Sequence, residues 1–269
     1  YVCATSRSHK GSKDREMIRM GSDEAHIKLN VKKNGLPYRI DMHLKKNKSK
    51  GIAVNGIPIK RAVELFGILN IVCFSPEDLS IIKNGPAERR RFMDMELSQL
   101  DKIYLSNLIN YNKVVNQRNK LLKELSFKSS EEKLETLDIW DLQLVKYGTE
   151  VMKRRVGFVQ ELNEIIGGLH EKLSGGTEKL TIEYQPCVEE TTFLDTVTKM
   201  RERDLRMKST CFGPHKDDLI FFINGSEVKK YGSQGQQRTA ALSLKLAEIE
   251  LVKKVVKDTP VLLLDDVLS

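Results

Sequence analysis

The sequence predicts an α/β protein in which antiparallel β-hairpins precede a long helical insertion, and a strand, a helix and a final strand follow it. Three observations support this class. Apolar residues alternate with polar ones around the Asn-Gly pairs at 34–35, 55–56 and 224–225. Apolar residues at helical spacing continue from residue 97 to residue 173. An uninterrupted apolar run at 261–264 follows another helical pattern near the end of the chain.

The first predicted element is a hairpin over residues 26–44. Ile27, Leu29 and Val31 alternate with polar residues before the first Asn-Gly pair, and the alternation resumes after it. A two-residue hairpin turn needs positive φ at both positions, which Asn and Gly adopt readily. A second hairpin around residues 55–56, a short helix near 61–69 and a buried strand at 68–74 follow.

The helical periodicity predicts two long helices, separated by the polar residues 126–133. A short connection favours an antiparallel pair of helices, so an inserted arm is expected at 85–176. We expect this arm to separate a first lobe, residues 1–84, from a second lobe, residues 177–269.

The second lobe begins with a predicted strand at 179–184, followed by a short helix at 193–205. A strand at 219–223 should turn at the third Asn-Gly pair, with Val228 on the returning strand. A helix at 234–257 should end at Asp258 and Pro260. The apolar run that follows predicts a strand buried on both faces.

Charge and composition favour an anionic partner without proving one. The chain has 45 Lys and Arg against 37 Asp and Glu, a net charge of +8 and a pI near 9.2. Nucleic acid is the first candidate, although a basic but ordinary surface fits equally well. The four scattered cysteines indicate neither a disulfide framework nor a zinc site. With no signal peptide or apolar membrane span, the expected location is the cytoplasm.

Two adjacent acids, Asp265 and Asp266, follow the last predicted strand. The carboxyl edge of a sheet is where open α/β folds bind ligands. Two neighbouring carboxylates repel each other unless a cation or a proton lies between them. Magnesium bound to a polyphosphate would satisfy them, as in a Walker B motif. The alternative is an acidic turn that caps a following helix.

The segment GSQGQQRT, residues 232–239, strengthens the nucleotide interpretation. Gly232 and Gly235 allow close approach of the backbone to a ligand, and Ser233 can cap the helix that begins there. The exposed amides of a first helical turn attract anions. The alternative is a well-capped helix whose Gln side chains only face the solvent.

Five segments together resemble the RecF family of bacterial DNA-repair ATPases, which are relatives of ABC-type and SMC heads. They are residues 6–19 (SRSHKGSKDREMIR), 74–94 (FSPEDLSIIKNGPAERRRFMD), 213–218 (GPHKDD), 233–239 (SQGQQRT) and 262–269 (LLLDDVLS). The resemblance covers almost the whole chain. It implies an ABC-type ATPase head, similar to P-loop NTPases, with the hairpins and the inserted arm described above.

The resemblance also implies roles for single residues. Ser233, Gln234, Gly235 and Gln236 match the signature motif, which contacts the γ-phosphate of ATP held by the opposite subunit. Asp265 matches the acid that binds Mg²⁺, and Asp266 stands at the position of the catalytic base. No P-loop, G-x-x-x-x-G-K-[ST], occurs in the chain. We therefore expect a fragment that lacks the P-loop and the C-terminal end, and that hydrolyses little or no ATP alone.

The implied function is DNA repair, recombination and replication through an ATP-dependent homodimer that clamps single-stranded DNA or gapped duplex. The resemblance adds RecO and RecR as partners in loading recombinase. Arg89, Arg90 and Arg91 are the predicted DNA contacts, since clustered cations hold phosphates without reading sequence. The alternative function is a non-catalytic DNA-binding or scaffold protein with no nucleotide dependence.

The GPHKDD segment leaves its chemistry open. His215, Asp217 and Asp218 could form a metal site, but a turn hydrogen-bonded by its own Asp side chains is the commoner arrangement. The central geometric expectation is that Gly235 and Asp265 lie on the same rim, so that two copies can share a triphosphate.

Overall fold

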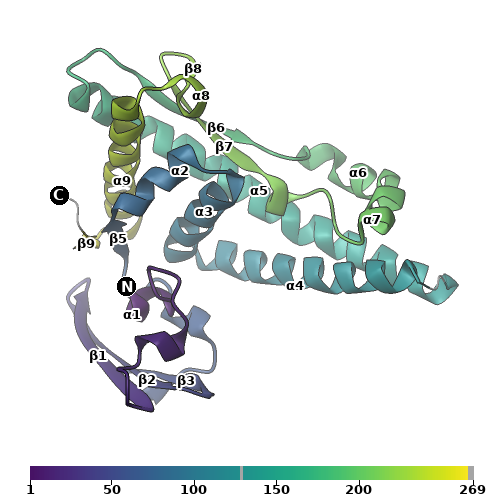
Figure 1. The fold of residues 1–269 in the computed structure, drawn as a ribbon, viewed down its shortest axis with the longest axis horizontal. Helices are drawn as coiled ribbons and strands as arrows, with labels where there is room; N and C mark the ends of the chain where they lie inside the picture. The colour runs from purple at the N-terminus through teal and green to yellow at the C-terminus, as the bar shows by residue number, and fades with distance from the viewer. Residues whose placement is uncertain (128–129, 266–269) are drawn as a thin grey trace. The chain divides into compact units, whose positions relative to one another are not determined.

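The computed structural model describes residues 1–127 and 130–265, which form two compact units (Figure 1). The sheet unit comprises Tyr1–Pro76, Ser98–Lys102 and Lys245–Ser269. The arm unit comprises Glu77–Leu97 and Ile103–Leu244. Each unit is described by itself below. The division into two lobes and an arm, predicted from the sequence, stays a prediction.

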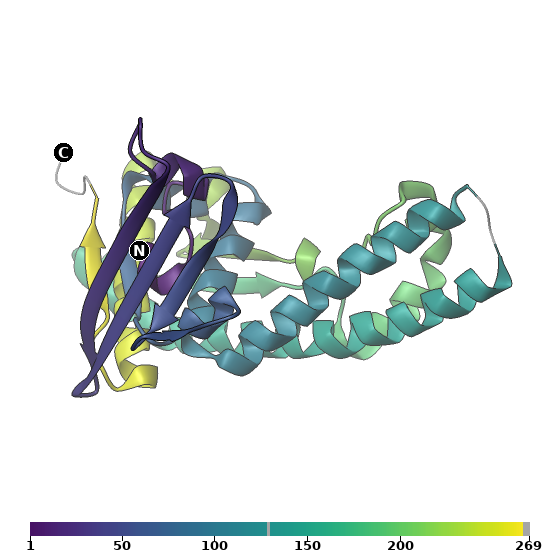
Figure 2. The same cartoon turned by 90° about the horizontal axis from the view of Figure 1, so that it is seen from below.

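An antiparallel sheet of four strands dominates the sheet unit (Figure 2). The strands β1 (Glu24–Lys33), β2 (Leu36–Lys45), β3 (Lys48–Val54) and β4 (Ile57–Pro58) pair in sequence order. Lys33 pairs with Leu36, which places Asn34 and Gly35 in the turn with φ of 49° and 79°. Both predicted hairpins are therefore present, although the last strand has only two residues.

One face of this sheet forms the core of the sheet unit. Ile40, Met42 and Ile52 are buried there against Leu65 and Cys3. Leu65 lies in η2 (Ala62–Leu65), a 3-10 turn where a short helix was predicted, and Cys3 lies in α1 (Val2–Thr5). A second 3-10 turn, η1 (Asp14–Met17), lies between α1 and the sheet in the sequence.

A separate parallel pair joins β5 (Ile71–Phe74) to β9 (Val261–Leu264). Val72 and Phe74 pack against Ile249 and Val252 of α9 (Gln234–Val256). The prediction that the last strand is buried on both faces is wrong for this structure, since Val261, Leu262 and Leu264 are 43%, 46% and 67% exposed. Among the described residues β9 pairs only with β5, so its other edge carries no strand.

Two long antiparallel helices form the body of the arm unit and lie side by side in Figures 1 and 2. They are α4 (Lys102–Leu125) and α5 (Glu131–Leu173), and they confirm the predicted helix pair. Leu121, Leu122 and Leu125 of α4 pack against Leu137 of α5. Three shorter elements precede them: η3 (Pro76–Asp78), α2 (Leu79–Lys83) and α3 (Pro86–Leu100).

A three-stranded antiparallel sheet lies along α5. Its strands are β6 (Leu180–Gln185), β7 (Asp218–Ile223) and β8 (Ser226–Glu227). The Asn163 side chain of α5 exchanges two hydrogen bonds of 2.8 Å with the backbone of Ile182 on β6. The predicted strands and their Asn-Gly turn are therefore correct.

Two local predictions differ from the structure. The helix expected at 193–205 is two helices, α6 (Phe193–Lys199) and α7 (Arg201–Met207), with Met200 between them, after the turn η4 (Glu190–Thr192). Val228 begins α8 (Val228–Tyr231) instead of continuing the returning strand. The turn η5 (Pro214–Lys216) precedes β7. Within the described part of the chain, no helix combines the length and apolarity that a bilayer crossing requires.

Candidate functional site

The signature segment, residues 233–236, forms the amino end of α9. The Ser233 Oγ accepts a hydrogen bond of 3.1 Å from the Gln236 amide, and Gln236 Oε1 accepts one of 2.8 Å from the Ser233 amide. This reciprocal pair is a capping box, so Ser233 caps the helix as predicted. Ser233, Gln234 and Gly235 are exposed. The Gln236 amide is taken by Ser233, so the amides of Gln234 and Gly235 are the ones in the first turn that an anion could contact.

A partly buried chain of polar contacts holds Gln236 in place. Its Nε2 donates to Glu178 Oε1 at 2.8 Å, and the other oxygen of Glu178 lies 3.1 Å from His170 Nε2. His170, on α5, also contacts Ser243 Oγ at 2.9 Å through its Nδ1. Glu178 was not predicted from the sequence, because it lies in a connecting loop 58 residues before Gln236. The Gln236 side chain is thus tied to α5 through Glu178.

Asp265 lies directly after β9, at the carboxyl end of the parallel pair. Its amide donates to the Phe74 carbonyl at 2.9 Å, which continues the pairing of β5 and β9 by one residue. Its side chain is 45% exposed and lies 3.4 Å from the Lys10 ammonium. An exposed carboxylate in this place can accept a cation, with Lys10 as its competitor. Asp266 lies outside the described residues.

The signature segment belongs to the arm unit and Asp265 to the sheet unit. The expectation that Gly235 and Asp265 share one rim therefore stays a prediction.

Asp217 of the GPHKDD segment is buried and fully engaged by protein groups. It accepts hydrogen bonds from the Cys187 amide at 2.7 Å, from Arg155 at 3.2 Å and from the Tyr184 hydroxyl. Burial raises the pKa of Asp217, and these donors act in the opposite direction. With its oxygens occupied in this way, Asp217 anchors the segment and does not offer a metal site.

His215 is also held by protein on both ring nitrogens. Nε2 lies 3.0 Å from the Thr210 carbonyl, so it carries the proton, and Nδ1 accepts from the Tyr111 hydroxyl at 2.6 Å. Burial lowers the pKa of His215 to about 4. Gly213 has φ of 128°, and a Cβ there would overlap the Tyr111 hydroxyl. The segment is a tightly fitted structural turn. It differs from the predicted alternative, a turn hydrogen-bonded by its own Asp side chains, because Asp217 binds Arg155, Tyr184 and the Cys187 amide instead.

The three arginines predicted to contact DNA lie in three different environments. Arg89 is 4% exposed, and its guanidinium binds both oxygens of Asp218, at 2.6 and 2.8 Å. It also donates to the Asn84 carbonyl at 2.8 Å. Arg90 is half-buried and donates to the Asp217 carbonyl at 2.7 Å, whereas Arg91 is exposed. Arg89 therefore has no open face for a phosphate in this structure, which corrects its inclusion among the predicted DNA contacts.

Two buried arginines outside the predicted site residues connect the helices of the arm unit. Arg155 binds Asp94 at 2.7 Å and the Pro214 carbonyl at 2.7 Å, in addition to Asp217. Arg118 binds Asp141 at 2.6 Å and Asp204 at 2.5 Å. Both occupy apolar helix faces, a position where a charged residue needs a buried partner. A charged residue at an apolar position of a helical pattern is therefore the sequence signal by which both arginines could have been found.

No protein-family model matches the chain. A curated protein of Lachnospira eligens, named DNA replication and repair protein RecF, is 69% identical over 269 residues, which are 100% of this chain and 74% of that protein. A protein of the same name from Lachnoclostridium phytofermentans is 62% identical, with the same coverage.

The chain belongs to the RecF family.

Solved structures of RecF agree with this assignment and with the fold. One, described as "Structure of the recombination mediator protein RecF-ATPrS in RecFOR pathway", has a TM-score of 0.93 and 36% identity over 100% of this chain and 74% of its own. A second, described as RecF-ATP in the RecFOR pathway, has the same score and identity over 99% of this chain and 73% of its own. The α/β head with hairpins and a helical insertion, predicted from the sequence, is therefore the RecF fold.

Proposed function

We propose that this RecF-family chain is part of a DNA-repair ATPase, in which ATP and Mg²⁺ join two copies into a dimer that clamps DNA. The observation that carries the proposal is the exposed, doubly capped amino end of α9, where Ser233 and Gly235 face the solvent and Gln236 is fixed by Glu178. A fixed, exposed turn of amides suits a phosphate brought by another copy. The RecF relatives solved with nucleotide add support.

Each site residue has a role in this proposal. Ser233, Gln234, Gly235 and Gln236 would contact the γ-phosphate of ATP bound by the opposite copy. Asp265 would bind Mg²⁺, which its exposed carboxylate fits, and Lys10 would have to give way. Asp266 would act as the base that takes a proton from the attacking water. Bound ATP and Mg²⁺ would supply the phosphoryl group and the charge that neutralises it.

Arg90 and Arg91 are the proposed DNA contacts, because Arg89 is directed into the protein. Single-stranded DNA and gapped duplex are the proposed substrates. RecO and RecR are proposed partners, in line with the RecFOR pathway named for the solved relatives. The proposed location is the cytoplasm, where the four free cysteines would stay reduced. A chain of these 269 residues alone should hydrolyse no ATP, since its sequence contains no P-loop.

Two substitutions of Ser233 test, in the full-length protein, whether residues 233–236 are the signature motif. Ser233→Asp keeps an excellent helix cap but places a carboxylate where the phosphate should bind. Ser233→Asn keeps the cap without the charge and serves as the matched control. We expect the Asp variant to fold normally and to lose ATP-dependent dimerisation in sedimentation velocity, while the Asn variant retains most of it.

Dimerisation of the Asp variant at the wild-type level would show that residues 233–236 are not the signature motif. DNA affinity that does not change with ATP and Mg²⁺ in the wild-type protein would favour the alternative, a non-catalytic DNA-binding or scaffold protein.

A further inference from the structure

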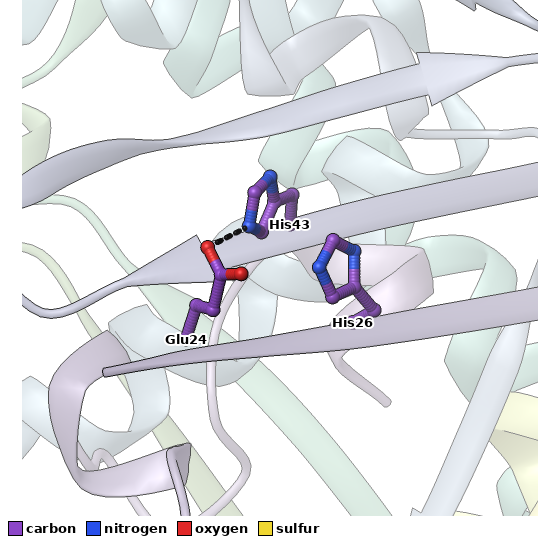
Figure 3. A group of neighbouring side chains, drawn as sticks. All are labelled: Glu24, His26 and His43. Atoms are coloured by element: carbon purple, nitrogen blue, oxygen red, sulfur yellow. Dashed lines mark hydrogen bonds and ion pairs between the residues drawn. The ribbon is translucent and has the colours of Figure 1, made fainter. Parts of the chain in front are cut away.

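Three potential metal ligands lie together on the four-stranded sheet (Figure 3). Glu24 and His26 are on β1 and His43 is on β2. The atoms that each could offer to a metal all lie within 4.8 Å of one another. Glu24 and His26 are exposed and His43 is half-buried, so an ion can reach them from solvent.

Strand geometry explains why these side chains meet. Residues two apart on a strand point to the same face, which places Glu24 beside His26. The register of β1 and β2 sets His26 directly opposite His43. Their rings are stacked, with centroids 3.9 Å apart and an interplanar angle of 22°. Both rings extend from their strands toward the carboxylate of Glu24 in Figure 3.

In the structure, His43 and Lys45 both contact the carboxylate of Glu24. His43 Nε2 lies 2.9 Å from Glu24 Oε2, and the Lys45 ammonium lies 3.3 Å from the same oxygen. Lys45 therefore occupies one side of the carboxylate that a metal ion would share or take over.

We propose that Glu24, His26 and His43 form a binding site for a divalent transition metal, with Zn²⁺ as the representative ion. Imidazole binds Zn²⁺ and other late first-row transition metals better than Mg²⁺ and Ca²⁺, which prefer oxygen ligands. Two imidazoles and one carboxylate form the three-ligand set of open zinc sites, with a fourth position left for water. This site is independent of the proposed ATPase function and uses none of its residues.

A bound metal ion would cross-link β1 and β2, which are already paired, at the end of the hairpin away from the Asn34-Gly35 turn. Glu24 pairs with Lys45 at that end, where β1 begins and β2 ends. An ion that binds only the folded sheet shifts unfolding to higher temperature. The consequence is a sheet whose stability responds to the supply of metal.

The first test is a titration of the full-length protein with Zn²⁺ by calorimetry. His26→Gln and His43→Gln should each lower Zn²⁺ affinity at least about tenfold. Substitution of a residue that only supports a metal ligand already lowers affinity about tenfold or more, and these two variants each remove a ligand. His9→Gln, which changes a half-buried histidine outside the cluster, should leave the affinity unchanged. Circular dichroism of each variant without metal checks that it is folded.

Lys45→Gln gives the opposite and sharper prediction, because it removes the competing ammonium while all three ligands stay. We expect it to raise Zn²⁺ affinity, and Glu24→Gln to lower it. No measurable Zn²⁺ binding by the wild-type protein would overturn the proposal. Binding that survives both His variants would overturn it as well, since the ion would then occupy another site such as the cysteines.

Discussion

At the scale of single residues, buried polar side chains hold the GPHKDD segment in place. Arg155, Asp217 and His215 lie at its centre, and each finds its partners within the protein. Removing one partner of such a pair leaves a charge buried without compensation, which costs more than the pair contributes. The segment therefore fixes where β7 begins relative to α5, and its residues serve position rather than chemistry.

His215 makes unfolding of the protein sensitive to acid. Its pKa is about 4 in the folded state and near 6.5 when it is exposed, so the unfolded chain binds more protons between these values. Stability is therefore present above pH 6.5 and is lost as pH falls toward 4. The loss from this residue is about 3 kcal/mol over that window. Urea denaturation at several pH values should show a smaller pH dependence in His215→Gln than in the wild type.

His9→Gln, which replaces a histidine outside the GPHKDD segment, is the control for that measurement. Direct observation of the His215 ring by NMR is the decisive check. Burial outweighs the hydrogen bond with the Thr210 carbonyl and the charge of Asp204, which raise the pKa of His215, and the charges of Lys216 and Arg90 lower it further. A ring that titrates near pH 6.5 in the folded protein would contradict the buried, neutral imidazole described above.

The sequence could not predict which residues far apart in the chain form hydrogen bonds and ion pairs with the site residues. The arginine triplet was visible in the sequence, but Arg89 pairs with Asp218, which lies 129 residues away. Nothing local distinguishes it from Arg91. Ser233, in contrast, caps a helix within four residues of itself, and short-range chemistry of this kind was predicted correctly. The difference lies in the sequence distance between the partners.

The same distinction holds for whole elements. The hairpins and the long helices follow from local patterns, namely Asn-Gly turns and apolar spacing, and both were predicted. The burial of β9 depends on which strands lie beside it, which its four apolar residues do not encode. Likewise, β8 is only two residues long because α8 begins at Val228, and the apolar character of Val228 suits either element.

Two glycines in α5 predict opposite effects of the same substitution. A Cβ at Gly148 would lie 2.6 Å from the Phe193 ring of α6, whereas a Cβ at Gly168 would meet nothing within 4 Å. Gly168→Ala should stabilise the protein by up to about 1 kcal/mol, because alanine favours the helix. Gly148→Ala should destabilise it by about 1–3 kcal/mol through overpacking. Urea denaturation of both variants measures the difference.

An equal gain in stability for both variants would show that Phe193 moves aside at little cost. In that case α6 would be packed loosely against α5, contrary to the fully buried Phe193 of the structure.

At the scale of the whole molecule, the net charge of +8 does not say which cations are available to a partner. Several cations are neutralised inside the protein, including the buried Arg89, Arg118 and Arg155. Their partner carboxylates are equally unavailable, so the free charge is set by exposed residues. Arg91 is one of these, since it lies on the exposed side of α3.

The proposed DNA contact of Arg91 can be measured through salt dependence. Each contact with a phosphate of duplex DNA releases counterions and makes the slope of log affinity against log salt concentration steeper by about 0.9. Arg91→Gln in the full-length protein with ATP and Mg²⁺ should therefore reduce the slope by about 0.9 and weaken binding to all DNA sequences alike. Lys123→Gln, an exposed cation near the end of α4, is the matched control and should leave the slope unchanged. Because both variants lower the net charge by one, equal slopes in the two would assign the effect to the overall charge and remove Arg91 from the DNA surface.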